Sequence, residues 1–208
     1  MSLIFENLTF FYKDQQDRKI LDNFNLELTP QARIGVYGKK GTGKSTILKI
    51  LNGEINNYSG TISIDGKSIA EMNNTSAKIS LLYQNPEKQF IFPKIKDEYK
   101  FIVQNRNDAT EKRIKKISHV FNFNLAEIIK SERTIFDLSS GEIRLLQIIF
   151  TLARDMNYYI MDEPFQYLDD EDRLHFVNYL DELNNYAILF LSSKKKVLQP
   201  LSERIINF

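Results

Sequence analysis

A glycine-rich segment at residues 38–45 has the composition and spacing of a loop that binds phosphate. It reads GKKGTGKS and matches the pattern G-x4-G-K-S/T. Glycines let backbone N–H groups turn inward around a polyphosphate, and the positive end of a following helix adds to the attraction. Lys44 is expected to neutralise charge on the β- and γ-phosphates, and the Ser45 hydroxyl to ligate Mg2+. The residues predicted to bind nucleotide here are Gly38, Lys39, Gly41, Thr42, Gly43, Lys44, Ser45 and Thr46.

Two adjacent carboxylates follow an apolar segment much later in the chain. Asp162 and Glu163 come directly after residues 158–161, which have the character of a buried strand. At the end of that strand, Asp162 is placed to hold Mg2+ through water, and Glu163 to orient and polarise an attacking water. Alone, such a pair could simply open a loop. Together with the phosphate loop, it predicts a site that binds and cleaves a nucleoside triphosphate.

Composition restricts the class of protein. The 208 residues are 42% hydrophobic and 26% charged, which is typical of a globular domain. The formal net charge of +1 argues against nucleic acid as a partner. The absence of cysteine excludes thiol catalysis and thiolate metal sites, and the two histidines, His119 and His175, argue against a histidine-built metal site.

The sequence offers no candidate for a membrane-spanning helix or a signal peptide. Its apolar stretches, such as residues 186–191, are far shorter than the roughly 20 residues that a spanning helix needs. The first ten residues lack a basic region followed by an apolar run. We therefore expect a cytoplasmic protein that reaches the inner face of the cell membrane only through partner subunits.

Periodicity predicts strands and helices in alternation around these motifs, and hence a mostly parallel sheet covered on both faces. A helix is expected to start near Lys44, and another to cover residues 140–154. Asp65-Gly66 has the character of a hairpin turn. From about residue 85 the charge rises, and Ile114, Ile117 and Phe121 mark an amphipathic helix in a helical insertion. The expected strands cover 3–12, 24–28, 33–37, 61–64, 79–83, 158–161 and 187–191.

Several further segments resemble the ATP-binding cassette (ABC) family. Residues 138–142, LSSGE, are similar to its LSGGQ signature. Gln84 falls at the Q-loop position and Asp169 at the D-loop position. Tyr12 matches the aromatic residue that stacks on adenine, with Phe11 as the nearest competitor. Within the family, the segment QNPEKQF that begins at Gln84 is similar to the ATPases of energy-coupling-factor and cobalt-type importers.

The resemblance implies a single nucleotide-binding domain over residues 1–208. Its α/β fold would have a P-loop NTPase core with a mostly parallel sheet, an N-terminal antiparallel β subdomain and a helical insertion at about 85–145. It also implies ATP and Mg2+ as cofactors, and a transport-coupled ATPase that drives uptake of a small solute such as a vitamin or a metal ion. The partners would be a second ABC ATPase subunit and a membrane-embedded transporter subunit.

In such a pair, two cassettes close face to face around two ATP molecules. The resemblance implies catalytic roles for Lys44, Gln84 and Glu163 in one chain. It also implies metal ligation by Ser45, Gln84 and Asp162. The signature residues that would face the same ATP from the other chain are Ser139, Ser140, Gly141 and Glu142.

Two positions depart from the family pattern. Ser140 replaces a signature glycine, which reduces the freedom of the backbone there. Ser193 stands where the family has a switch histidine that contacts the γ-phosphate, and a serine cannot become cationic. We therefore expect slower hydrolysis. Ser139 and Glu142 also form the helix capping box S-x-x-E, an interpretation compatible with the signature.

Other functions fit parts of the sequence. One is a nucleotide-binding regulatory subunit with a degenerate, weakly hydrolytic site in a heterodimer, which Ser193 favours and Glu163 opposes. Another is a cassette acting on DNA or ribosomes, which the near-zero net charge opposes. A small P-loop kinase would leave residues 138–142 without a role.

The stretch that follows Gln84 is the candidate contact with the membrane subunit. Residues 85–101 run into the helical insertion and are more apolar than a solvated surface requires. The alternative is that the apolar side chains pack inside the helical lobe. These side chains are Phe90, Ile91, Phe92 and Phe101.

Overall fold

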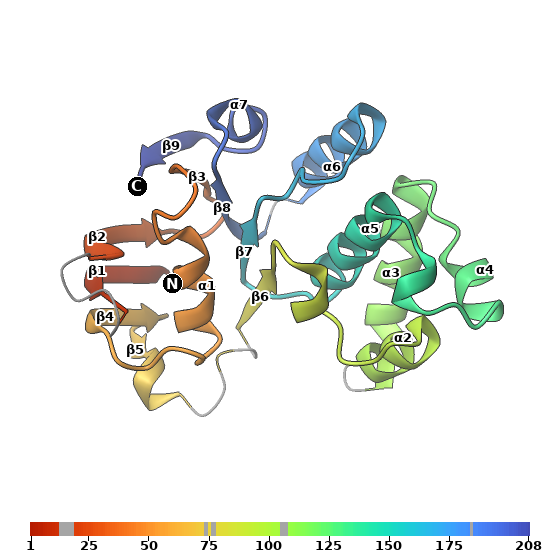
Figure 1. Cartoon of the computed structure of the whole chain (residues 1–208), viewed down its shortest axis with the longest axis horizontal. Helices are drawn as coiled ribbons and strands as arrows, with labels where there is room; N and C mark the ends of the chain where they lie inside the picture. The colour runs from red at the N-terminus through yellow and green to blue at the C-terminus, as the bar shows by residue number, and fades with distance from the viewer. Residues whose placement is uncertain (13–18, 73–74, 76–77, 105–107, 184) are drawn as a thin grey trace. The chain divides into compact units, whose positions relative to one another are not determined.

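The computed structural model describes residues 1–12, 19–72, 75, 78–104, 108–183 and 185–208 (Figure 1). The chain forms two compact units, each built from segments that are distant in sequence. The first unit consists of Met1–Leu81, Met156–Pro164 and Asn184–Phe208. The second consists of Leu82–Asp155 and Phe165–Leu183.

An antiparallel sheet occupies the N-terminal part of the first unit, in the strand order β2-β1-β4-β5. Strand β1 pairs with both β2 and β4, and a bulge around Asn7 keeps its apolar side chains buried on both sides of the irregularity. The predicted hairpin turn is confirmed, because Asp65 and Gly66 both have positive φ and join two paired strands. The strands are β1 (Leu3–Phe10), β2 (Leu21–Leu28), β4 (Ser59–Ile64) and β5 (Lys67–Ser68).

The second sheet of the first unit has the order β6-β7-β8-β3-β9. Strand β8 pairs in parallel with β7 on one side and with β3 on the other (Figure 1). Because parallel strands end at the same edge, whatever follows β3, β7 and β8 is brought together. The strands are β3 (Arg33–Tyr37), β6 (Ile79–Leu82), β7 (Tyr158–Asp162), β8 (Ala187–Ser192) and β9 (Arg204–Asn207). The helices of this unit are α1 (Lys44–Leu51), η2 (Ile69–Glu71) and α7 (Lys195–Leu198).

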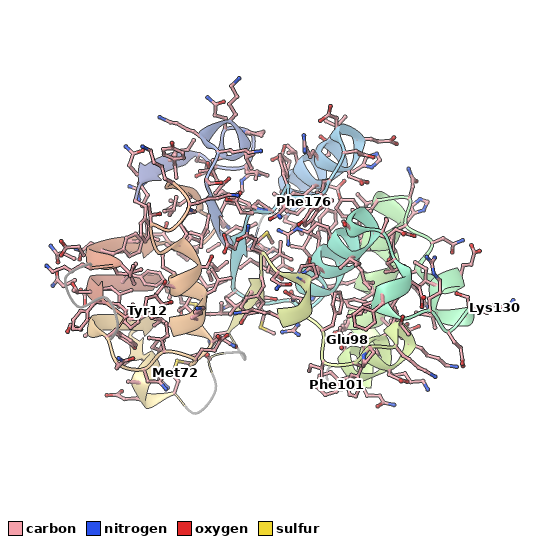
Figure 2. All side chains as sticks on the ribbon, viewed as in Figure 1. Tyr12, Met72, Glu98, Phe101, Lys130 and Phe176 are labelled. Carbon is pink, nitrogen blue, oxygen red and sulfur yellow. The ribbon has the colours of Figure 1, made fainter. Side chains whose placement is uncertain are left out.

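The second unit is helical. Its core includes the predicted apolar positions Ile114, Ile117 and Phe121, all of which are buried. Phe176 is labelled in Figure 2. Its ring packs against Phe121 at a centroid distance of 6.4 Å and against Phe165 at 6.0 Å. The helices are α2 (Ile95–Gln104), α3 (Asp108–Val120), α4 (Leu125–Lys130), α5 (Ser140–Leu152) and α6 (Asp170–Glu182), with short η4 (Pro86–Lys88) and η5 (Ile135–Asp137).

The expected α/β fold, with a parallel sheet, an N-terminal antiparallel sheet and helices, is confirmed. Helix α6 belongs to the helical unit although it lies outside the predicted insertion at about 85–145. The assignment of residues 1–208 to one nucleotide-binding domain stays a prediction. Among the described residues, none of the helices combines the length and apolar character needed to cross a bilayer.

Candidate nucleotide and metal site

The phosphate loop begins where β3 ends. The N–H of Gly38 donates a hydrogen bond to the carbonyl of Ser192 at 3.1 Å, which fixes the start of the loop to the end of β8. Gly43 has a φ of 105°, and a Cβ at this residue would lie 2.6 Å from the carbonyl oxygen of Ile20. Only glycine fits there without strain. Helix α1 starts at the next residue, so the motif has the strand-loop-helix context that it requires.

Lys44 lies buried within the curve of this loop. Its ammonium group donates hydrogen bonds to the carbonyl oxygens of Gly38, at 2.5 Å, and Lys39, at 2.9 Å. Burial lowers the pKa of Lys44 below its ordinary value, and the nearby carboxylates of Glu163 and Asp162 offset part of this effect. A phosphate oxygen is a stronger partner for an ammonium group than a neutral carbonyl, so the loop geometry suits a polyphosphate.

Ser45 and Asp162 form the direct link between α1 and β7. The Ser45 hydroxyl donates to Asp162 Oδ2 at 2.5 Å, and the Asp162 side chain is only 2% exposed. A hydroxyl and a carboxylate are hard oxygen ligands of the kind that Mg2+ prefers. Two of the three predicted metal ligands therefore lie together. Gln84 belongs to the other unit and has an exposed side chain, so its part in the metal site remains a prediction.

Glu163 continues the pairing of β7 with β8. It has a left-handed backbone with a φ of 48°, and its N–H donates to the carbonyl of Leu191 at 2.9 Å. The Ser192 hydroxyl donates to Glu163 Oε2 at 2.8 Å, and the N–H of Ser193 donates to Oε1 at 2.6 Å. The sequence indicated Glu163 and Ser193 as site residues, but it did not indicate Ser192.

Tyr12 follows β1 and contacts the helix that follows the phosphate loop. Its ring packs edge-on against Phe10 at a centroid distance of 4.9 Å. Its hydroxyl accepts a hydrogen bond from Lys49 of α1 at 3.2 Å, and the same ammonium group lies 5.5 Å from the ring centroid. Tyr12 is thus tied to α1, whereas Phe11 is 45% exposed. Stacking of adenine on Tyr12 remains a prediction.

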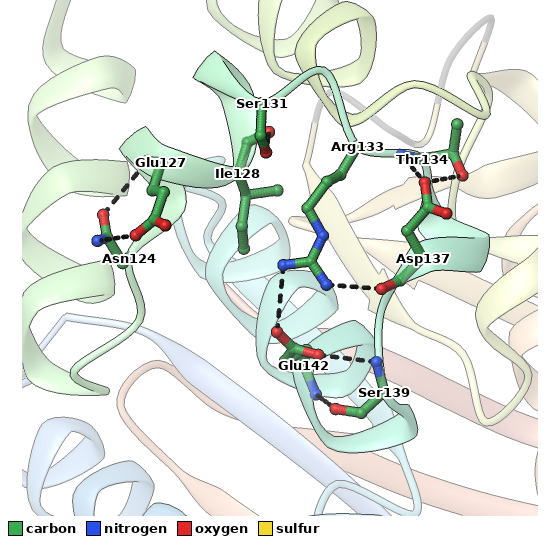
Figure 3. A network of polar contacts seen from close by, with 9 residues as sticks. All are labelled: Asn124, Glu127, Ile128, Ser131, Arg133, Thr134, Asp137, Ser139 and Glu142. Carbon is green, nitrogen blue, oxygen red and sulfur yellow. Dashed lines mark hydrogen bonds and ion pairs between the residues drawn. The ribbon is translucent and has the colours of Figure 1, made fainter.

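The signature segment belongs to the second unit and starts α5 (Figure 3). The predicted capping box is confirmed: the N–H of Glu142 donates to Ser139 Oγ at 3.2 Å, and the N–H of Ser139 donates to Glu142 Oε2 at 2.8 Å. This backbone hydrogen bond lowers the pKa of Glu142, and the guanidinium of Arg133, 3.7 Å from Oε1, acts in the same direction. Ser139 Oγ accepts in the cap, which leaves its own hydrogen able to donate to another group.

The neighbouring signature and D-loop residues also have defined local roles. Ser140 is the exposed first residue of α5 and is not among the described residues with positive φ, so serine fits its backbone without strain. A Cβ at Gly141 would lie 3.3 Å from the carbonyl oxygen of Tyr167. Asp169 caps α6 by accepting from the N–H of Asp172 at 2.8 Å. Contact of these residues with a second subunit's ATP remains a prediction.

Arg144 is a residue that the sequence reasoning missed. It is completely buried on α5, and its guanidinium donates to the carbonyl of Tyr83 at 2.8 Å and to Gln147 at 3.2 Å. Gln89 adds a second link, because its side chain accepts from the N–H of Tyr83 and donates to Thr151. The segment around Gln84 is therefore attached to the signature helix. The sequence held one signal that could have indicated Arg144, because it is an arginine among the apolar residues of the helix predicted at 140–154.

The family follows from a comparison with known proteins. Residues 21–166, well over half of the chain, match the family model described as ABC transporter. The chain belongs to the ABC transporter family. This confirms the resemblance inferred from the motifs and, at the level of the family, the expected ATPase class.

Curated relatives agree with the more specific resemblance of this ABC chain. The energy-coupling factor transporter ATP-binding protein EcfA of Pediococcus pentosaceus is 29% identical over 181 residues, which are 86% of this chain and 64% of the relative. EcfA2 of Clostridium tetani is 29% identical, with 99% of this chain and 75% of the relative covered. The ABC chain thus spans just under two thirds of the first relative and three quarters of the second. The relatives give no support to the alternative of a regulatory subunit with a degenerate site.

Solved structures confirm the fold of the ABC chain. A structure described as the ATP binding subunit of an ABC transporter superposes with a TM-score of 0.84 at 17% identity, covering 100% of this chain and 86% of the other. A bacterial Atm1-family ABC exporter with ATP bound superposes with a TM-score of 0.80 at 21% identity, covering 36% of the exporter chain. At these identities the likeness concerns the fold alone.

The position of Lys44 predicts a selective loss of nucleotide binding. Lys44→Ala should weaken Mg2+-ATP binding roughly 100-fold, since a charge-assisted hydrogen bond to phosphate is worth up to about 3 kcal/mol. The wild-type chain should bind Mg2+-ATP more tightly than AMP, because the loop holds the β- and γ-phosphates. Isothermal titration calorimetry measures both, with Lys67→Ala on the exposed β4–β5 hairpin as the charge-matched control. Wild-type ATP affinity in Lys44→Ala, or equal affinity for ATP and AMP, would contradict the assignment.

Proposed function

We propose that this chain binds Mg2+-ATP and hydrolyses it to power a membrane transporter. The observation that carries the proposal is the convergence of Lys44, Ser45, Asp162 and Glu163 at one edge of the parallel sheet. The Ser45–Asp162 hydrogen bond joins two of these groups, and Ser192 bonds both Glu163 and Gly38, the first residue of the loop that contains Lys44. A cation, a hydroxyl and two carboxylates are groups suited to phosphoryl transfer to water.

Each side chain has a separate task in this proposal. Lys44 and the N–H groups of the loop hold the phosphates, and Ser45 and Asp162 hold Mg2+, which neutralises charge on the phosphate oxygens. Glu163 accepts a hydrogen bond from the attacking water and aligns it with the γ-phosphate. Gln84 is proposed to contact the metal or that water. Tyr12 is proposed to support the adenine ring.

A second ABC ATPase subunit, identical or different, completes the site in this proposal. The hydroxyl of its Ser139, whose oxygen accepts in the cap, would donate its hydrogen to the γ-phosphate at the positive end of helix α5. The capping box favours this role, because it fixes the Ser139 hydroxyl beside the first turn of the helix. ATP binding would then close the dimer, and hydrolysis would reopen it.

Glu163→Gln should separate binding from hydrolysis. The amide keeps the size of the side chain, but it accepts the proton of the attacking water poorly, so turnover should fall about 100-fold or more while ATP affinity stays within a few-fold. The variant should accumulate as a dimer with ATP in analytical ultracentrifugation, whereas the control Glu27→Gln, at an exposed position of β2, should not. Hydrolysis by Glu163→Gln at the wild-type rate would show that another group orients the water.

The relatives named as energy-coupling factor transporter ATP-binding proteins support a role in transport. Uptake as its direction rests on the resemblance of residues 84–90, QNPEKQF, to importer ATPases. We infer that the solute is small, such as a vitamin or a metal ion, and that a membrane-embedded subunit binds this chain at the inner face of the cell membrane. The chain itself would remain peripheral. Nucleic acid is not expected as a partner, given the net charge of +1.

The segment after Gln84 supports a docking site for that membrane subunit. The buried carboxylate of Glu98 accepts hydrogen bonds from the N–H groups of Ile91, at 2.8 Å, and Phe92, at 2.9 Å. This fixes a turn on which Ile91 is 61% exposed. Phe92 packs on Phe101 at a centroid distance of 5.7 Å, whereas Phe90 packs on Phe150 of α5. Phe90 therefore packs within the helical unit, as the alternative interpretation of this stretch expects. Ile91 is exposed and is the better candidate for a contact with a partner.

Ile91→Asp is therefore the sharper test of docking. It should abolish co-purification with the membrane subunit while leaving ATP affinity and the melting temperature close to wild type, because Ile91 is mostly exposed. Leu174→Asp, which changes an equally exposed leucine of α6, should leave the association intact. Phe90→Asp should instead lower stability by about 1–3 kcal/mol, because it replaces a half-buried ring that packs on Phe150 with a charge. Normal association of Ile91→Asp would place the docking site elsewhere.

A further inference from the structure

Ser192 is the last residue of β8, and the sheet places it between the two halves of the candidate site. Strand β8 lies between β7, which carries Asp162, and β3, which leads into the phosphate loop. The backbone carbonyl of Ser192 accepts the hydrogen bond of Gly38, the first residue of the loop, at 3.1 Å. Its side chain is completely buried. One residue therefore contacts both the start of the phosphate loop and, through its side chain, Glu163.

The hydrogen bonds of the Ser192 hydroxyl determine where its single hydrogen points. The N–H of Lys194 donates to Ser192 Oγ at 3.1 Å, so this lone pair is occupied. The hydroxyl hydrogen is then directed to Glu163 Oε2, 2.8 Å away. Ser193 contributes only its backbone N–H, which donates to Oε1 at 2.6 Å. Each oxygen of the carboxylate thus has one donor from residues 192–193.

Glu163 needs such a restraint because of its backbone. Its φ of 48° places a non-glycine residue in the left-handed region, which is unfavourable for an L side chain and persists only where the surroundings hold it. The hydrogen bond from its N–H to Leu191 and the two donors to its carboxylate supply that restraint. Ser192 provides the one side-chain contribution among these three bonds.

We propose that Ser192 is the positioning residue for Glu163, an inference that rests on the proposed function of Glu163 as the group that orients the attacking water. Ser192 does not touch the nucleotide in this account. It acts through Glu163 by holding the carboxylate in one orientation with the hydrogen bond from its hydroxyl. The Glu163 carboxylate is held by two donors, the hydroxyl of Ser192 and the backbone N–H of Ser193.

Ser192→Ala removes the donor to Oε2 and lets the carboxylate rotate. Because misorientation affects the chemical step and not nucleotide binding, kcat should fall about 10-fold while KM for ATP changes less than about 2-fold. Ser192→Thr keeps the hydroxyl and should restore kcat. Ser192→Cys keeps the size of the side chain but is a poor donor, so it should reproduce the loss even if Ser192→Ala folds poorly. Ser202→Ala removes a hydroxyl that bonds the carbonyl of Leu198, and it should have no effect on kcat.

The experiment has two parts. Steady-state Mg2+-ATP turnover is measured for the full chain and these variants, and crystal structures are determined for the wild type and Ser192→Ala. The expected structures show the Glu163 carboxylate on Ser192 in the wild type and displaced in the variant. A wild-type kcat in both Ser192→Ala and Ser192→Cys, or an unmoved carboxylate in Ser192→Ala, would overturn the inference. An absence of hydrolysis by the wild-type chain would count against the proposed function instead, and the two crystal structures would still decide whether Ser192 holds Glu163.

Discussion

The parallel pairing of β7, β8 and β3 is the constraint on which the candidate site depends. Its register aligns Asp162 with Leu191 and Tyr37 with Ser192, so the three strands end at one edge. The residues that follow them then have to meet there, although they come from widely separated parts of the sequence. Burial of β7 and β8 along their whole length makes this register costly to change, because a slip would disrupt the close packing of side chains that are buried on both faces.

The chain matches each charged or polar group at this edge with a partner of its own. Lys44 is bound by loop carbonyls, Asp162 by the Ser45 hydroxyl, and Glu163 by Ser192 and Ser193. These contacts hold the side chains where the proposed reaction requires them, so little rearrangement is needed for binding. A polyphosphate and a divalent cation would exchange neutral partners for charged ones, which is the direction in which electrostatic energy is gained.

The sequence alone predicted the parts of this arrangement that are continuous in the chain. The phosphate loop, the β7 strand with its two acids and the capping box at Ser139 each depend on residues within a few positions, and their spacing determines their geometry. Ser192, Arg144 and Lys49 were missed because their partners are distant in sequence, and a serine at the end of a strand or a lysine in a helix has no local signature. Helices α2 and α6 were missed because charged residues interrupt their apolar pattern, and only packing within the second unit reveals their buried faces.

We propose that Ser45 and Asp162 form the Mg2+ site of an ATP-binding centre. The most direct measurement is the ATP affinity of the wild type and of Asp162→Asn, each with Mg2+ and with EDTA in its place. We predict that Mg2+ strengthens ATP binding by the wild type about 10-fold or more, and that this gain is lost in Asp162→Asn, because a neutral amide is a weak ligand for Mg2+. An equal Mg2+ effect on both proteins, with ATP bound by each, would contradict it.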